Sequence, residues 1–86
     1  MRIKTSELTE QGLMHVLSLP DLSWQTCGPI IEREGISIYR MTSDWSAAYN
    51  PSGAAQDGPT PLIAAMRCYV AGKLGESVEV PEELFA

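Results

Sequence analysis

Residues 60–75 have the sequence TPLIAAMRCYVAGKLG, which carries the start and stop signals of a complete helix. Thr60 is a favoured N-cap residue, Pro61 is favoured at the first helical position, and Gly75 is typical of a helix end. Apolar residues repeat at helical spacing along the segment: Leu62, Ala65, Met66, Tyr69 and Val70. Because the flanking positions are also largely apolar, the sequence predicts a helix that lies mostly buried.

The segments before this helix predict a β-hairpin. Residues 36–41 alternate apolar and polar side chains, and residues 45–49 form a shorter extended run after the turn residues 42–44. A polar stretch, residues 50–59, then leads to the helix. A connection of about ten residues is longer than usual, which favours a binding loop over a simple link.

The remaining elements are shorter. Residues 10–19 predict a first helix with Thr9 as N-cap, a staple between Leu8 and Leu13, and an end at Pro20. We interpret residues 22–27 as an irregular connection and residues 30–35 as a helical turn or a strand. Residues 1–4 and 78–80 predict short edge strands. The expected fold is a single α+β domain over residues 1–86: a small antiparallel sheet, made of the hairpin and short edge strands, packed on two helices, the C-terminal one buried.

The chain is acidic, with a net charge of −5 over 86 residues. This charge disfavours binding to the backbone of duplex nucleic acid. A core of this size is thin, so a homo-oligomer is an expected source of stability. The N-terminus lacks the apolar run of a secretory signal, and the longest apolar run, Leu62 to Met66, is too short for a membrane span. We therefore expect a cytoplasmic protein with Cys27 and Cys68 as free thiols.

Catalytic and metal-binding patterns are absent from the sequence. His15 is the only histidine, and three Cys and His residues without ligand spacing cannot make a structural zinc site. The glycines fit neither the dinucleotide fingerprint nor the P-loop. We expect no enzyme activity, no metal and no cofactor.

Five residues are candidates for binding a nucleotide-sized ligand. Trp45 and Tyr39 could stack on a base, Arg33 and Arg67 could donate to phosphate, and Thr60 opens a helix N-terminus that could receive an anion. The alternative is that the aromatic side chains fill the core, the arginines are solvated and Thr60 is only a cap.

Three segments of the chain resemble the NinX family of bacteriophage proteins. They are residues 4–9 (KTSELT), 28–36 (GPIIEREGI) and 58–70 (GPTPLIAAMRCYV), and the closing segment 74–84 agrees as well. The chain departs from the family at residues 12–17, GLMHVL, where many relatives carry an ALDWAV-type run. Any role of that family tryptophan therefore does not carry over.

The resemblance implies a phage or prophage origin and a place in the host cytoplasm, but no established activity. Small accessory phage proteins often counter host defence by binding. The leading hypothesis is thus a non-enzymatic homo-oligomer that sequesters a nucleotide-derived immune signal in pockets between subunits. The alternative hypothesis is an interaction protein that inhibits a host enzyme, with the acidic region from Glu76 to Glu83 docking on a basic partner.

Overall fold

The computed structural model describes residues 1–49 and 55–84 of the chain. In chain order the elements are β1 (Arg2–Lys4), the 3₁₀ turn η1 (Thr5–Glu7), α1 (Glu10–Leu17), α2 (Trp24–Glu34), β2 (Ile36–Arg40), β3 (Trp45–Tyr49), β4 (Gln56–Gly58), α3 (Pro61–Leu74), β5 (Ser77–Glu79) and the 3₁₀ turn η2 (Glu82–Leu84). The α+β class is confirmed, with three helices and two small antiparallel sheets.

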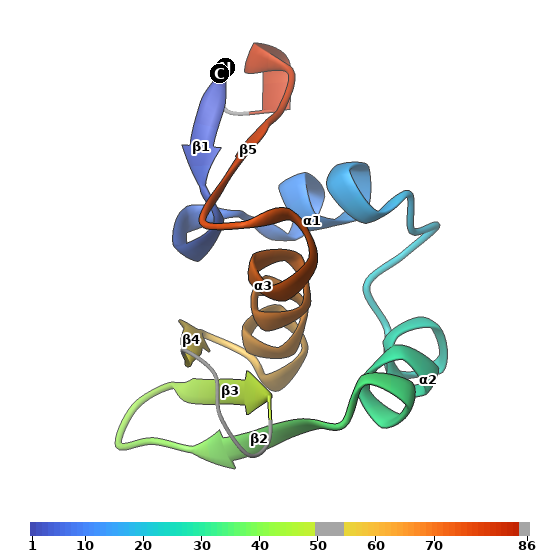
Figure 1. Cartoon of the computed structure of the whole chain (residues 1–86), viewed down its shortest axis with the longest axis vertical. Coiled ribbons are helices and arrows are strands. Elements are labelled where there is room, and N and C mark those ends of the chain that lie inside the picture. The colour runs from blue at the N-terminus through green and yellow to red at the C-terminus, as the bar shows by residue number, and fades with distance from the viewer. Residues whose placement is uncertain (50–54, 85–86) are drawn as a thin grey trace.

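Helix α3 forms the centre of the molecule, and the other elements surround it (Figure 1). Its start agrees with the prediction, because the Oγ1 atom of Thr60 accepts a hydrogen bond from the Ile63 N–H at 3.2 Å. Its buried residues come from several sides of the helix: Ile63, Ala64, Ala65, Met66, Cys68 and Val70. The prediction of a largely buried C-terminal helix is confirmed.

The predicted hairpin is the first part of a three-stranded sheet in the order β2-β3-β4. Ile36 pairs with Tyr49 and Arg40 with Trp45. Strand β4 was not predicted: it lies in the stretch interpreted as a ten-residue loop, and it pairs Gly58 with Trp45. Residues 50–54 of that loop lie outside the described residues. Gly58 permits this strand, because a Cβ there would stand 2.7 Å from the backbone nitrogen of Ala64.

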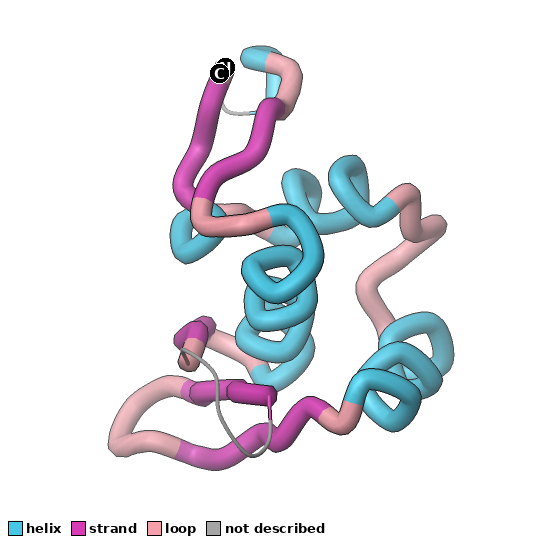
Figure 2. The backbone as a smooth tube through the Cα atoms, in the orientation of Figure 1, coloured by secondary structure: helices cyan, strands magenta, loops and turns pink. Residues whose placement is uncertain are grey.

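The two edge strands pair with each other, not with the hairpin. Strands β1 and β5 form a separate antiparallel sheet, with Arg2 opposite Glu79. The tube in Figure 2 shows the two sheets at opposite ends of α3. Thr5 ties the smaller sheet to the end of α3, since its N–H donates to the Glu76 carbonyl at 2.7 Å and its Oγ1 donates to the Gly75 carbonyl at 2.6 Å.

Helix α1 follows its sequence signals closely. The side chain of Thr9 accepts from the Gly12 N–H at 3.3 Å, and both members of the predicted staple, Leu8 and Leu13, are fully buried. The helix ends at Leu17, and Ser18 adopts the left-handed conformation with φ of 56° two residues before Pro20.

Helix α2 corrects the sequence interpretation of residues 22–35. Residues 24–34 form one helix, which begins after the N-cap Ser23 and ends before Gly35, with φ of 69°. The irregular connection is wrong from residue 24 on, and of the two alternatives for residues 30–35 the helical one is correct, as part of a longer helix. The dipeptide Gly28-Pro29 lies inside it. A residue before proline avoids the helical region because its Cβ meets the proline ring, and Gly28 has no Cβ. The described residues therefore form three α-helices where two were expected.

The core contains both cysteines. Cys27 of α2 and Cys68 of α3 are buried free thiols. In the part of the chain that the structure describes, no helix has the length and apolar character that a membrane crossing requires.

Candidate functional site

A surface hollow of about 520 Å³ opens beside α3, and we call it the Arg67 hollow. Its wall is made by Ser6, Asp44, Arg67 and the segment 55–59. These residues come from η1, the turn before β3, the β4 region and α3, so the hollow exists only after the chain has folded. A second hollow of about 440 Å³ shares Ser6 and Gln56 with the first.

The guanidinium of Arg67 is held in place by main-chain oxygens. Its Nε donates to the Leu8 carbonyl at 2.9 Å and its Nη1 donates to the Asp57 carbonyl at 2.7 Å. Among residues 1–49 and 55–84, no hydrogen bond involves its Nη2 and no carboxylate forms an ion pair with it. Arg67 is therefore an oriented cation with donor capacity left over.

Burial lowers the pKa of Arg67, and the nearby negative charge of Asp57 opposes that shift. A lowered pKa of an arginine means that its surroundings disfavour the charged guanidinium. An anionic group at the free side of the guanidinium would relieve this cost, because charge-assisted hydrogen bonds are the strongest that Arg makes.

The rest of the wall has mixed polarity. Asp44 and Asp57 bring carboxylates, whereas Ser6 and Gln56 bring neutral groups that both donate and accept. The site therefore does not suit a bare anion. It suits a ligand with an anionic or carbonyl group at one end and hydroxyl or amino donors at the other.

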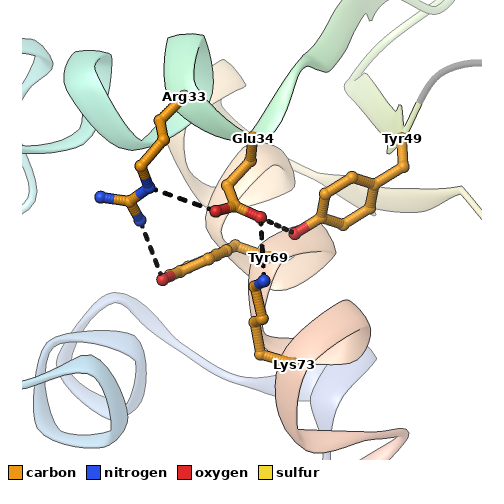
Figure 3. A network of polar contacts seen from close by, with 5 residues as sticks. All are labelled: Arg33, Glu34, Tyr49, Tyr69 and Lys73. Carbon is orange, nitrogen blue, oxygen red and sulfur yellow. Dashed lines mark hydrogen bonds and ion pairs between the residues drawn. The ribbon is translucent and has the colours of Figure 1, made fainter.

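A second polar arrangement joins α2, β3 and α3, and Figure 3 shows its five side chains. The carboxylate of Glu34 lies at its centre, 3.2 Å from Lys73 Nζ and from Arg33 Nε, and 3.3 Å from Tyr49 Oη. Lys73 above all lowers the pKa of Glu34, with burial acting in the opposite direction. Burial and then the charge of Glu34 raise the pKa of Tyr49 to about 12.

This Glu34 cluster satisfies its own members. Arg33 Nη2 donates to Tyr69 Oη at 3.1 Å, so every side chain in it has a partner inside it. Such an arrangement fastens α2 to the central helix. We therefore assign the cluster a role in stability and keep the Arg67 hollow as the candidate site.

The predicted binding residues are not brought together. Tyr39 pairs with Ser46 and Trp45 with Arg40, so Tyr39 and Trp45 point to opposite faces of the hairpin. The guanidinium of Arg40 lies 5.2 Å from the centre of the Trp45 ring and occupies one of its faces. Arg33 belongs to the Glu34 cluster.

Two predicted residues remain near the hollow. Arg67 forms part of its wall, and Thr60 follows the wall residue Pro59. The side-chain oxygen of Thr60 is already used as the acceptor of its own helix cap. Ser6, Asp44 and Gln56 were missed by sequence reasoning, because nothing in their local sequence signals that tertiary contacts bring them to Arg67.

Metal-ligating side chains do not gather in the described residues: no three His, Cys, Asp or Glu residues come together there. The family described as Bacteriophage P22, NinX matches residues 3–73 of the chain, a range that contains the whole wall of the Arg67 hollow. The chain belongs to the NinX family. The match confirms the resemblance seen in the sequence, and the closing segment 74–84 lies beyond it. A search of curated proteins finds no match to this NinX-family chain.

Proposed function

We propose that this NinX-family chain is a non-enzymatic phage accessory protein that counters host defence by sequestering a small nucleotide-derived immune signal in the Arg67 hollow. One observation carries the proposal. A partly buried arginine, oriented by two main-chain carbonyls and lacking a carboxylate partner among the described residues, lies in the wall of an open hollow. Its free donors suit a phosphate oxygen.

The remaining wall residues complement the other parts of a nucleotide. The carboxylates of Asp44 and Asp57 can accept hydrogen bonds from ribose hydroxyls or base amino groups, and Gln56 can both donate and accept. A hollow of about 520 Å³ also falls in the usual range for small-ligand sites. The mixed charge favours a nucleotide over inorganic phosphate, because phosphate alone would leave the two carboxylates facing an anion.

The same wall supports binding without chemistry. Among the described residues of the wall, Ser6 is the only one with a hydroxyl side chain, and His15, the only histidine of the sequence, lies exposed on α1 outside it. A serine nucleophile ordinarily needs an adjacent general base. Sequestration requires only affinity and an intact ligand, so it fits this set of residues.

The test is a binding screen with mononucleotides, linear oligonucleotides and cyclic dinucleotides. We expect one class to raise the melting temperature of the protein and to bind in calorimetry, and to be recovered unchanged. Ser6→Ala and Asp44→Ala should weaken that binding by about ten-fold or more, since each removes a hydrogen bond to the ligand. Arg40→Gln, an exposed arginine outside the hollow, is the matched control and should bind as the wild type does.

Arg67→Lys keeps the positive charge but replaces the planar fork of guanidinium nitrogens by one ammonium nitrogen, so it should bind the nucleotide more weakly than the wild type. Its melting temperature and circular dichroism show whether the fold survives. If no nucleotide class binds, or if the wall variants bind like the control, the proposal is wrong. A nucleotide recovered in altered form would instead establish an enzyme.

A second candidate function is inhibition of a host protein, and the exposed acid of the C-terminal region favours it. Glu76, Glu79, Glu82 and Glu83 are all exposed. Such charge would steer the protein toward a basic partner and make the affinity fall with salt. Capture experiments with the wild type and with E82Q/E83Q, at low and high salt, separate this function from nucleotide binding.

A further inference from the structure

Strand β2 has an open edge. The sheet order is β2-β3-β4, and within the described part of the chain no strand pairs on the outer side of β2. Figure 1 shows β2 along the border of the molecule, with β3 between it and β4. Open edges present unpaired N–H and C=O groups, which natural proteins usually block or use for pairing.

One hydrogen bond shows which backbone groups face outward. The Met41 N–H donates to the Asp44 carbonyl at 2.8 Å, in the register that also pairs Tyr39 with Ser46. Hydrogen-bonded pairs alternate along an antiparallel ladder, so residues 37, 39 and 41 direct their backbone groups toward β3. The N–H and C=O groups of Ile36, Ile38 and Arg40 consequently point away from the sheet.

We propose that this edge binds the same edge of a second copy, as an antiparallel pair with its two-fold axis at Ile38. This register sets Ile38 against Ile38 of the second copy and Ile36 against its Arg40. All the outward backbone groups of both strands are then hydrogen-bonded. The two three-stranded sheets become one continuous sheet, with both α3 helices on the same face.

The charges on β2 and its flanks favour this antiparallel arrangement. Glu32 and Glu34 lie just before the strand, at the end of α2, and Arg40 ends it. Glu34 is already paired with Arg33 and Lys73, so the exposed Glu32 is the carboxylate that can attract a second copy. Antiparallel pairing brings Arg40 of each copy toward Glu32 of the other, whereas parallel pairing would align like charges.

The acidic tails stay apart in the same arrangement. Each chain carries a net charge of −5, which opposes association. However, β5 and η2, which carry the exposed glutamates of the C-terminal region, lie at the end of the molecule opposite to β2 (Figure 1). A dimer joined at β2 therefore has its two acidic tails at its far ends.

Exposed apolar side chains accompany the edge. Tyr39 and Met41 are 44% and 46% exposed, and they alternate onto the same outer face of the hairpin. In the proposed register Tyr39 lies directly opposite Ser37 of the second copy. Residues 36–40 include no proline and no lysine, and their one charged side chain, Arg40, stacks on the Trp45 ring of β3.

The experiment measures the mass of the intact protein by sedimentation over a wide concentration range, with two charge variants. The wild type should approach twice its chain mass of 9.4 kDa as concentration rises. S37K/Y39K places like charges opposite each other across the two-fold, and S37E/Y39K places opposite charges there. The dissociation constants of these variants should differ by about ten-fold or more, with S37E/Y39K the tighter dimer.

If only the long-range repulsion between the two acidic chains mattered, S37K/Y39K would be the tighter dimer, because it brings the net charge of each chain closer to zero. Ile38→Pro offers an independent check: it removes one outward N–H and no bond to β3, so it should give a folded monomer by circular dichroism.

A mass of 9.4 kDa at every concentration, or equal dissociation constants for the two charge variants, would overturn the proposal. So would a dimer that persists in Ile38→Pro. Capture of an unrelated extended peptide by a monomeric wild type would show that the edge serves a different partner. None of the substituted residues lines the Arg67 hollow, so nucleotide binding is scored separately.

Discussion

The ring of Tyr49 lies so close to Gly72 that a Cβ added at Gly72 would stand 2.6 Å from Cε2 of the ring. Real Cβ atoms essentially never come so near, so Gly72 leaves the space that the ring fills. From this position Tyr49 Oη reaches the Glu34 carboxylate at 3.3 Å (Figure 3). The absence of one side chain on α3 thus allows β3 to contact α2.

Gly72→Ala should destabilise the protein by up to about 2 kcal/mol. The added methyl group displaces the Tyr49 ring at a cost of roughly 1–3 kcal/mol, and the better helix propensity of alanine returns about 1 kcal/mol at most. Urea unfolding measures the change. In a Tyr49→Ala background the clash is gone, and the same substitution should be neutral or stabilising. Equal destabilisation in both backgrounds would contradict the role we give to the Tyr49 ring.

Stability should fall between pH 10 and about 12 because of Tyr49. Burial, followed by the charge of Glu34, raises the pKa of Tyr49 from 10.0 to about 12, so the folded state favours the neutral phenol. This contribution is fully present below pH 10 and is lost as the pH rises through the folded pKa. Urea unfolding of the wild type and of Tyr49→Phe across this range is the measurement. The free energy of unfolding of Tyr49→Phe should fall less over this pH interval than that of the wild type. If the two free energies fall in parallel, Tyr49 is not the group responsible.

Thr5→Val should destabilise the protein by about 1–3 kcal/mol, because it leaves the Gly75 carbonyl without the hydroxyl donor that bonds it in the wild type. Thr5 is fully buried, and valine keeps nearly the same volume, so the loss reports the hydrogen bond. Thr5→Ser is the matched control, as it keeps the hydroxyl and removes a methyl group. Chemical denaturation should give Thr5→Ser a higher free energy of unfolding than Thr5→Val. The opposite order would show that packing of the methyl group matters more than the hydrogen bond at this position.

The two thiols should be protected by folding. Cys27 and Cys68 are 0% and 1% exposed, and burial raises the pKa of both thiols. Since the thiolate is the reactive form, a colorimetric thiol reagent should react slowly with the native protein and rapidly with both cysteines in denaturant. Fast reaction of either thiol under native conditions would show that the core around α3 opens readily.

The hairpin and helices α1 and α3 could be predicted because their signals are local. A cap residue, a helical repeat and an alternating strand pattern each act within a few residues, as Thr9 and Thr60 show in their own caps. Helix α2 was missed because Gly28-Pro29 is usually a break. The helix continues there since glycine removes the clash that a Cβ would make with the proline ring.

The candidate site could be predicted only in part. Arg67 was identified because arginine is a residue type that binds phosphate. Its orientation depends on the main-chain carbonyls of Leu8 and Asp57, and because every residue has a carbonyl, the sequence does not signal these partners. Tyr39 and Trp45 looked like a pair in the sequence. The register of the hairpin separates them onto opposite faces, because only every second residue of a strand shares a face.

Composition and local sequence patterns were enough to predict the acidic charge, the α+β class, the buried C-terminal helix and the resemblance to the NinX family that the family match confirms. These properties follow from composition and from short-range patterns. Long-range packing was needed to show that β4 joins the sheet by pairing Gly58 with Trp45 and that β1 pairs with β5. It was also needed to show that Ser6, Asp44 and Gln56 meet Arg67 in one hollow. Such contacts join residues far apart in the chain, and they are set by the packing of whole elements around α3, which no local pattern of side chains encodes.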